Sequence, residues 1–298
     1  MKSDGTILIT GATGHQGGAV ARALQGSGFR LRGLTRKPES ERAMALAHQG
    51  VEVVKGDLDD DSTLRRALAG AWGVFAVQNT WEAGVEGEEA QGKRLATLAR
   101  ETGVEHYVYS SVGSAHKRTG VPHFENKWRI EETVRGLGFP SHVILRPVYF
   151  MENLLAPFSL QGDTLAAALR PDTKLQMIAV DDIGWFGARA FTDSTVLNGR
   201  EIDIAGDVRT MTEAAAILAK ALHRPITFAQ TPIEQVRQFS EDTAVMLEWF
   251  DRVGYSADIA GLEREFRRTL TKLPDWARRA AHSPRGPQTQ ASRDLESR

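Results

Sequence analysis

Residues 9–18 read "ITGATGHQGG" and place three glycines, Gly11, Gly14 and Gly17, directly after a β-branched run. In a strand–turn–helix unit the first glycine permits the tight turn, the second lets the backbone approach a pyrophosphate, and the third lets helix and strand pack closely. The pyrophosphate then meets free N–H groups at the helix N-terminus. The stretch predicts a dinucleotide-binding site, and the alternative is a glycine turn that serves structure alone. The candidate site also includes the residues between the glycines: Thr13, His15 and Gln16.

The rest of the chain continues this pattern, because short β-branched runs alternate with longer helical stretches. Helical patterns cover 16–28 and 88–103, and each closes on a glycine suited to a left-handed cap. Such a rhythm is typical of parallel strands joined by crossover helices. We expect an α/β fold with a doubly wound parallel (Rossmann) sheet and a smaller, helix-rich C-terminal region. Strands are predicted at 6–10, 30–36, 51–57, 73–79, 106–111 and 141–147.

The rhythm changes after Phe150, where helix-rich segments contain two isolated short strands, 201–205 and 225–229. We expect the domains to divide accordingly. The predicted parts are a Rossmann domain over 1–154 with segments from about 174–206 packing back on it, an interleaved substrate or partner region over 155–282, and a disordered polar tail over 283–298.

Composition excludes several classes of protein. The 298 residues carry 37 basic and 38 acidic side chains, so no global field favours nucleic acid or a membrane surface. The absence of cysteine excludes disulfides, thiolate metal ligands and a cysteine nucleophile. The N-terminus lacks the apolar region of a signal peptide, and no run reaches the roughly 18 apolar residues of a membrane helix. We expect a soluble cytoplasmic protein.

The histidines and the basic residues also point to no further ligand. The eight histidines are scattered without metal-ligand spacing, so no metal site is predicted. The basic run over 263–279 has aromatic residues interleaved, as a nucleic-acid surface would, but its glutamates and helical spacing favour a solvated amphipathic helix.

The end of the second predicted strand bears on which dinucleotide is bound. An NAD site usually has an acidic residue there for the ribose 2′-OH, whereas "LTRKPE" places Arg36 and Lys37 at that point. Cations suit the 2′-phosphate, so we expect NADP(H) and favour NAD(H) less; the alternative is a solvated basic turn. Asp57 and Leu58, in "KGDLDD" after the third strand, lie where an adenine edge would pass. An acidic loop with a helix cap explains that stretch equally well.

Several motifs together carry a family resemblance: "ITGATGHQGGAV", "LTRKP", "GDLDD", "HFENK", "RPVYFMENLL", "VDDIG" and "EWFDRVGYSADI". From about Thr6 to Leu273 the chain resembles the NmrA-like branch of the atypical short-chain dehydrogenases/reductases. The resemblance implies a Rossmann domain, a smaller C-terminal region and a cleft between them. It also implies either of two functions, because some members are redox-sensing regulators that bind NADP(H) without turnover and others reduce quinones, dyes or enones.

The stretch "HFENK", residues 123–127, departs from ordinary short-chain dehydrogenases, which place a tyrosine acid four residues before the lysine. Lys127 can still bind the nicotinamide ribose, and the alternative is an exposed helix lysine. His123 replaces the tyrosine. Because like-charge repulsion from Lys127 favours neutral imidazole, His123 is a poor proton donor, and it can equally cap or pack near the helix start.

Other polar residues are candidates for the same site. Ser111, and beside it Ser110, ends the fifth strand, where this fold supplies a hydroxyl to the substrate or a turn residue. Tyr149 is the best replacement acid, although an aromatic core role is the stronger alternative. Tyr149 and Asn153 are spaced to share one helical face if their segment is helical. Gln78 and Asn79, followed by Thr80 and Trp81, would border the nicotinamide, or serve as loop residues.

These residues favour an NADP(H)-binding protein that acts as a redox or cofactor sensor, or has weak reductase activity. The alternative is an NADPH-dependent reductase of quinones, enones or cationic dyes, since such substrates can accept a hydride and take their proton from water. The expected partners are a nicotinamide dinucleotide, a small hydrophobic carbonyl or quinone, and, for a sensor, another protein.

Overall fold

The computed structural model describes residues 5–282, which divide into two compact units. The first unit comprises the residues up to 147 together with 180–203, and the second comprises 148–179 together with the residues from 204 onward. The domain bounds expected from the sequence stay a prediction. The tail expected at 283–298 lies outside the described residues.

The first unit is built on a seven-stranded sheet in the order β11-β6-β5-β4-β1-β2-β3. All six strands predicted for the Rossmann sheet are present and pair in parallel. The strand order reverses between β1 and β4, the switch point at which α/β folds bind ligands beyond the carboxyl ends of the strands. The strands are β1 (Thr6–Ile9), β2 (Arg30–Thr35), β3 (Glu52–Lys55), β4 (Ala71–Ala76), β5 (His106–Ser110), β6 (Ser141–Pro147) and β11 (Glu201–Ile204).

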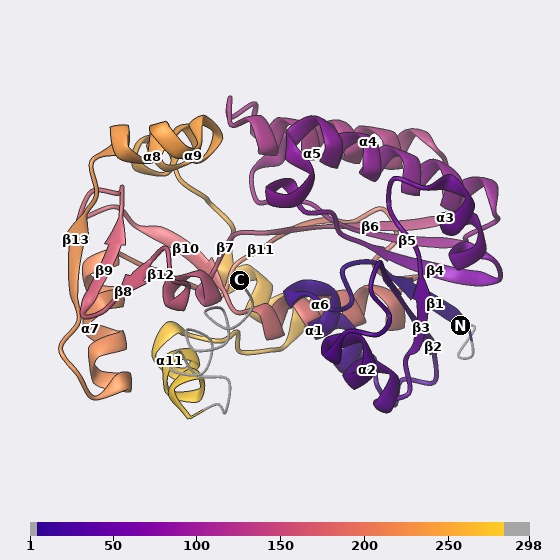
Figure 1. The fold of residues 1–298 in the computed structure, drawn as a ribbon, viewed down its shortest axis with the longest axis horizontal. Helices are drawn as coiled ribbons and strands as arrows, with labels where there is room; N and C mark the ends of the chain where they lie inside the picture. The colour runs from indigo at the N-terminus through magenta and orange to yellow at the C-terminus, as the bar shows by residue number, and fades with distance from the viewer. Residues whose placement is uncertain (1–4, 283–298) are drawn as a thin grey trace. The chain divides into compact units, whose positions relative to one another are not determined.

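Helices cover both faces of this sheet, as Figure 1 shows, with α3, α4 and α5 on one face and α1, α2 and α6 on the other. The expected doubly wound fold is therefore confirmed. Strand β5 is buried at all five residues, which is why "HYVYS" has no polar face toward water. The helices are α1 (His15–Ala23), α2 (Glu41–His48), α3 (Asp61–Leu68), α4 (Thr80–Glu101), the 3₁₀ turn η1 (Ala115–Lys117), α5 (Pro122–Gly136) and α6 (Val180–Thr192).

The second unit contains two three-stranded sheets as well as helices. One sheet has the order β12-β10-β7 and the other β13-β9-β8. The strands are β7 (Tyr149–Phe150), β8 (Leu160–Gln161), β9 (Thr164–Ala167), β10 (Leu175–Ile178), β12 (Asp207–Arg209) and β13 (Thr227–Gln230). The helices are the 3₁₀ turn η2 (Met151–Leu155), α7 (Met211–Leu222), α8 (Ile233–Phe239), α9 (Glu241–Arg252), α10 (Ile259–Phe266) and α11 (Leu273–Ala281).

Two local expectations for the later part of the chain differ in part from the structure. The strands predicted at 201–205 and 225–229 are present, but they are accompanied by further short strands: β11 joins the large sheet, and β13 pairs in parallel with β9. The basic run over 263–279 is two helices rather than one, since Arg267 adopts a left-handed conformation (φ 49°) after α10 and Pro274 lies in the first turn of α11. No helix within residues 5–282 is both long and apolar enough to cross a membrane.

Candidate functional site

The glycine loop has the geometry that close approach of a phosphate requires. Gly11 is left-handed (φ 58°), and Gly14 N–H donates to the Gly11 carbonyl at 2.9 Å. A Cβ built on Gly17 would lie 2.5 Å from the carbonyl carbon of Gly11, so only glycine lets α1 pack this closely on the turn. No side chain caps α1, and its first turn holds no acidic residue. The N–H groups of that turn are therefore open to an anion.

Polar contacts tie this loop to the carboxyl ends of β4 and β5. Ser110 Oγ donates to Gln16 Oε1 at 2.6 Å, and Thr10 Oγ1 exchanges hydrogen bonds with the backbone of Val77 at 2.8 Å. The Ser110 hydroxyl thus uses its proton to hold the side chain of Gln16 in position. Thr13 is half-buried and His15 exposed beside the same turn.

Two buried side chains at this edge of the sheet have no hydrogen-bond partner among the described residues. Both amide atoms of Gln78 and the Oγ of Ser111 are orphaned, although the residues are only 6% and 4% exposed. An unsatisfied buried polar group costs about 1–3 kcal/mol, so native proteins rarely retain one without a reason. Gln78 follows β4 and Ser111 follows β5, and these strands are neighbours. This arrangement fits a polar ligand lying across the ends of the strands.

A basic pocket of about 410 Å³ lies at the ends of β2 and β3. Its lining holds three cations, Arg36, Lys55 and Arg66, and two carboxylates, Asp57 and Asp60; of the cations, the sequence had indicated only Arg36. Arg36 forms an exposed ion pair with Glu82, at 2.6 Å between Nη2 and Oε2. Lys37 is exposed beside it. Lys55 and Arg66 were missed because single charges on a strand end and a helix look like ordinary solvated residues.

The acidic loop after β3 supplies the N-terminal cap of helix α3, as one of the two interpretations of this loop predicted. Asp60, rather than Asp57, caps α3 by accepting from the Ser62 and Thr63 backbone N–H groups. Asp57 Oδ1 accepts from Asp59 N–H at 3.1 Å and belongs to the lining of the basic pocket. Leu58 packs against the hydrophobic core. An adenine contact at Asp57 and Leu58 stays a prediction.

Lys127 is buried and paired, so the alternative of an exposed helix lysine is wrong. The residue is 9% exposed on α5, and its ammonium donates to Glu88, a fully buried residue of α4. Thr80 Oγ1 and Asn126 Nδ2 also donate to the Glu88 carboxylate. Burial alone would raise the pKa of Glu88, but the charge of Lys127 and these hydrogen bonds outweigh it and hold the pKa below its usual value. No motif pointed to Glu88, which lies 39 residues from Lys127 along the chain.

His123 lies in an aromatic environment. The side chain is 6% exposed, with its ring 5.5 Å from that of Trp81 and 4.7 Å from that of Phe124 between centroids. Trp81 itself is 64% exposed. The carboxylate of Glu88 neutralises the charge of Lys127, so the electrostatic repulsion predicted between Lys127 and His123 is weakened.

Asn79 caps α4, which gives that residue a structural role beside its predicted one. Its Oδ1 accepts from Trp81 N–H and its Nδ2 donates to Glu82 Oε1, both at 3.1 Å. The cofactor contact predicted for Asn79 stays a prediction.

Tyr149 and Asn153 belong to the second unit, and their segment is not the helix that a shared helical face would require. Tyr149 lies on strand β7, and Asn153 lies in the 3₁₀ turn that follows. The Tyr149 ring packs edge-on against Phe250. Burial raises the pKa of Tyr149 to about 12, with a hydrogen bond to Ser159 acting in the opposite direction. This setting opposes formation of a tyrosinate within the second unit.

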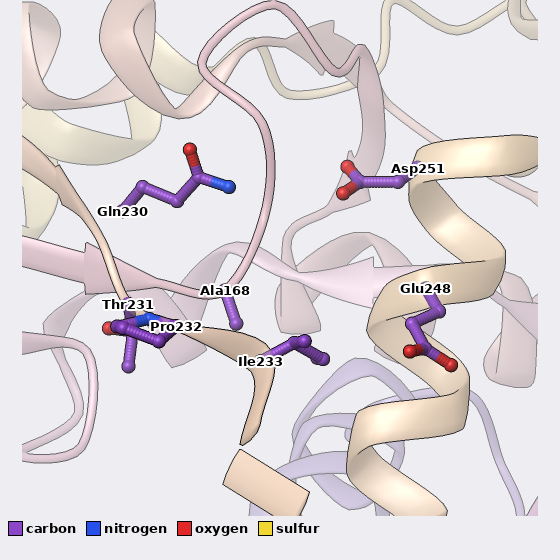
Figure 2. Close-up of a pocket in the computed structure, with 7 residues that line it drawn as sticks. All are labelled: Ala168, Gln230, Thr231, Pro232, Ile233, Glu248 and Asp251. Carbon is purple, nitrogen blue, oxygen red and sulfur yellow. The ribbon is translucent and has the colours of Figure 1, made fainter. Parts of the chain in front are cut away.

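A second pocket, of about 310 Å³, lies within the second unit between the segment Gln230–Ile233 and helix α9, as Figure 2 shows. Its acidic residues are already engaged, since Asp251 accepts from Arg170 N–H at 3.1 Å and Glu248 pairs with Arg237 at 2.6 Å. Among residues 5–282, no three histidine, aspartate or glutamate side chains are grouped so as to hold a metal ion.

Comparison with known proteins identifies the family. The model of the NmrA-like family matches residues 3–280. The chain belongs to the NmrA-like family. Within it, a (4-alkanoyl-5-oxo-2,5-dihydrofuran-3-yl)methyl phosphate reductase of Streptomyces griseus is 32% identical over 82% of this chain and 81% of its own length. The chain is also 36–37% identical, over 50–51% of its own residues, to family oxidoreductases from Cladobotryum, Aspergillus japonicus and Malbranchea aurantiaca, and it spans about half (48%) of their length.

Solved structures of the same fold include a regulator and an enzyme. NmrA, a negative transcriptional regulator, was solved in complex with NADP; it is 21% identical over 98% of both chains, with a TM-score of 0.79. The NADPH-dependent quinone oxidoreductase QOR2 of Escherichia coli is 24% identical over 91% of this chain and 98% of its own, with a TM-score of 0.75. At these identities the likeness establishes the fold.

Proposed function

We propose that this NmrA-like protein binds NADP(H) at the carboxyl edge of its seven-stranded sheet and acts as a redox or cofactor sensor, or has weak reductase activity. The glycine loop carries the proposal. It combines a left-handed Gly11, a Gly17 that leaves no room for a Cβ, and an uncapped helix N-terminus without acidic residues. A pyrophosphate supplies the negative charge and acceptor oxygens that these N–H groups lack.

The basic pocket supports NADP(H) over NAD(H). Arg36 follows β2, the position at which an NAD site usually carries an acidic residue, and Lys55 and Arg66 add positive charge to the same pocket. A 2′-phosphate there would gain charge-assisted hydrogen bonds that a 2′-hydroxyl cannot make. The orphaned Gln78 and Ser111 fit the nicotinamide end of the same ligand.

Lys127 and its partner Glu88 support the placement of the nicotinamide ribose. An ammonium held by a buried carboxylate keeps remaining N–H bonds for ribose hydroxyls and cannot swing into solvent. We assign Lys127 to ribose binding. His123, which is 6% exposed and packs against the rings of Trp81 and Phe124, is assigned a packing role and no obligatory proton transfer. When bound, NADPH supplies a hydride; the proton that completes reduction of a quinone to a hydroquinone comes from water.

A reductase of small hydrophobic carbonyls, quinones, enones or cationic dyes is the second candidate function. The Streptomyces griseus relative, named as a reductase of an unsaturated lactone phosphate, favours this reading. A sensor needs only different affinities of a partner for the loaded and empty states. The NADP complex of the regulator NmrA supports that reading.

The two functions are separated by measuring binding and turnover on the same preparation. Titration calorimetry with NADPH, NADP⁺, NADH and NAD⁺ should show preference for the phosphorylated forms. NADPH oxidation is then followed with quinones, enones, aldehydes and triphenylmethane dyes. Turnover well above the rate without protein establishes a reductase, and tight binding without turnover supports the sensor. Failure to bind any of the four dinucleotides would refute the proposed function.

A further inference from the structure

Glu82 lies where the proposed function places a phosphate. Its Oε2 is 2.6 Å from Arg36 Nη2, and its Oε1 accepts from Asn79 Nδ2 at 3.1 Å. Arg36 is the cation at the end of β2, and Glu82 comes from the first turn of α4, 46 residues away. A carboxylate supplied from a different element therefore holds the guanidinium that a 2′-phosphate would need.

We propose that Glu82 competes with the 2′-phosphate for Arg36, and so limits how strongly the protein prefers NADP(H) over NAD(H). The inference rests on the proposed dinucleotide function. NADP(H) must displace the Glu82 carboxylate from Arg36, whereas NAD(H) can bind with the ion pair intact. Glu82 consequently weakens the binding of the phosphorylated dinucleotide only.

The ion pair is of a kind that a phosphate can displace. The side chains of Arg36 and Glu82 are 63% and 58% exposed, and such surface pairs change an equilibrium by no more than about fivefold. A phosphate near neutral pH carries more negative charge than a carboxylate and offers three acceptor oxygens. Lys55 and Arg66 lie in the same pocket and add attraction for it. The competition thus reduces affinity without preventing binding.

The exposed side chain of Glu82 can leave Arg36 without movement of the helix. Thr80, in the same first turn, donates to the buried Glu88 and anchors the turn to the Lys127–Glu88 pair. The side chain of Glu82 takes no part in this buried contact and is 58% exposed. A change of its side-chain conformation therefore frees Arg36 while the Lys127–Glu88 pair stays in place.

The test compares Glu82→Gln with wild-type protein by titration calorimetry for NADPH and NADH. Glutamine keeps the shape and the contact with Asn79 but removes the charge. We expect NADPH to bind about two- to fivefold more tightly to the variant, and NADH affinity to change by less than about twofold. Glu86→Gln is the matched control, because Glu86 is an exposed glutamate of the same helix without an ion pair among the described residues; it should change neither affinity.

A double-mutant cycle identifies the cause. In an Arg36→Ala background, Glu82→Gln should no longer tighten NADPH binding, because there is no guanidinium left to compete for. A gain that persists in that background, or an equal change for NADPH and NADH in the single variant, would overturn the inference while leaving dinucleotide binding intact. If the wild-type protein binds neither dinucleotide, the proposed function itself fails, and this inference with it.

Discussion

At the scale of single residues, the site is organised by carboxylates that hold cations. Glu88 receives hydrogen bonds from Lys127, Thr80 and Asn126 in the protein interior, and Glu82 pairs with Arg36 at the surface. The two pairs differ in strength because water screens the exposed pair, whereas the buried carboxylate has no substitute for its partners. The buried pair therefore has a structural role, and the exposed pair can exchange partners.

The Lys127–Glu88 pair should make folding stability depend on pH. The pKa of Glu88 is lowered from 4.5, so its contribution is fully present above pH 4.5 and is lost as pH falls through the lower, folded-state pKa. Glu88→Gln leaves Lys127 buried without a counter-charge and should cost about 3–5 kcal/mol at pH 7. In urea denaturation, the difference from wild type should shrink below pH 4.5. A constant difference from pH 7 to pH 3 would contradict the predicted titration.

Lys127 and His123 should have separable effects on ligand binding. Lys127→Ala should weaken NADPH binding, but it also leaves the buried Glu88 carboxylate without its counter-charge. The double variant Lys127→Met/Glu88→Gln removes both charges and therefore tests ligand binding without an unpaired buried charge. His123→Phe should leave NADPH affinity nearly unchanged and lower any reductase rate by less than the roughly 10²–10⁴-fold typical of a lost general acid. Tyr149→Phe is the control for the other candidate acid. Abolished turnover in His123→Phe, with folding and affinity intact, would identify His123 as the acid.

At the scale of elements, the unit formed by β1, the glycine loop and α1 combines packing with ligand binding. The close approach of α1 to the turn, which excludes a Cβ at Gly17, brings the uncapped N–H groups of its first turn to the end of β1. Ser110 and Thr10 then link the same loop to the ends of β5 and β4. Rigid support on three strands is what a phosphate site built from backbone groups needs, because such groups cannot reorient individually.

Gly17→Ala should therefore disrupt binding through packing. The new Cβ would meet the backbone of Gly11 and Thr10 at 2.5 Å, and neither can move without opening the turn. We expect loss of stability of about 1–3 kcal/mol and at least a tenfold loss of NADPH affinity. Gly136→Ala is the control, since Gly136 ends α5 with open space around the added Cβ and should be neutral or slightly stabilising. Thermal denaturation and calorimetry measure both effects, and wild-type affinity in Gly17→Ala would refute the phosphate site.

At the scale of the whole molecule, the chain passes between its two units more than once. The first unit is completed by 180–203, which supplies α6 and the edge strand β11. Both the glycine loop and the basic pocket belong to this first unit. Ligand binding to it acts on a unit whose parts are distant in sequence, so it should stabilise the folded chain by mass action.

NADPH should accordingly raise the free energy of unfolding. At a free concentration 100 times its Kd, a ligand that binds only the folded state contributes about 2.7 kcal/mol. NADH at the same absolute concentration should contribute less if Arg36, Lys55 and Arg66 recognise the 2′-phosphate. Thermal denaturation with each dinucleotide measures the difference. Equal shifts of the melting temperature with NADPH and NADH would show that the basic pocket does not recognise the 2′-phosphate.

Much of the first unit could be predicted from local sequence. Each strand of the Rossmann sheet is a β-branched or aromatic run between turn signals, and the glycine spacing is itself the geometry of the turn. Strands β7 and β8, of two residues each, carry no periodicity and exist only through pairing with β10 and β9. The shared helical face considered for Tyr149 and Asn153 does not exist for this reason, because strand pairing places Tyr149 on β7.

The sequence by itself determined the fold class, the glycine loop and the cations after β2, since each depends on neighbouring residues and on backbone preferences. Only the tertiary structure decided that Lys127 is buried against Glu88, that Glu82 holds Arg36, and that Lys55 and Arg66 join the same pocket. It also decided that Gln78 and Ser111 are buried without partners. These features depend on which charges and hydrogen-bonding groups the folded chain brings together from different elements, and the energy of such pairs is set by distance and burial, which no local pattern encodes.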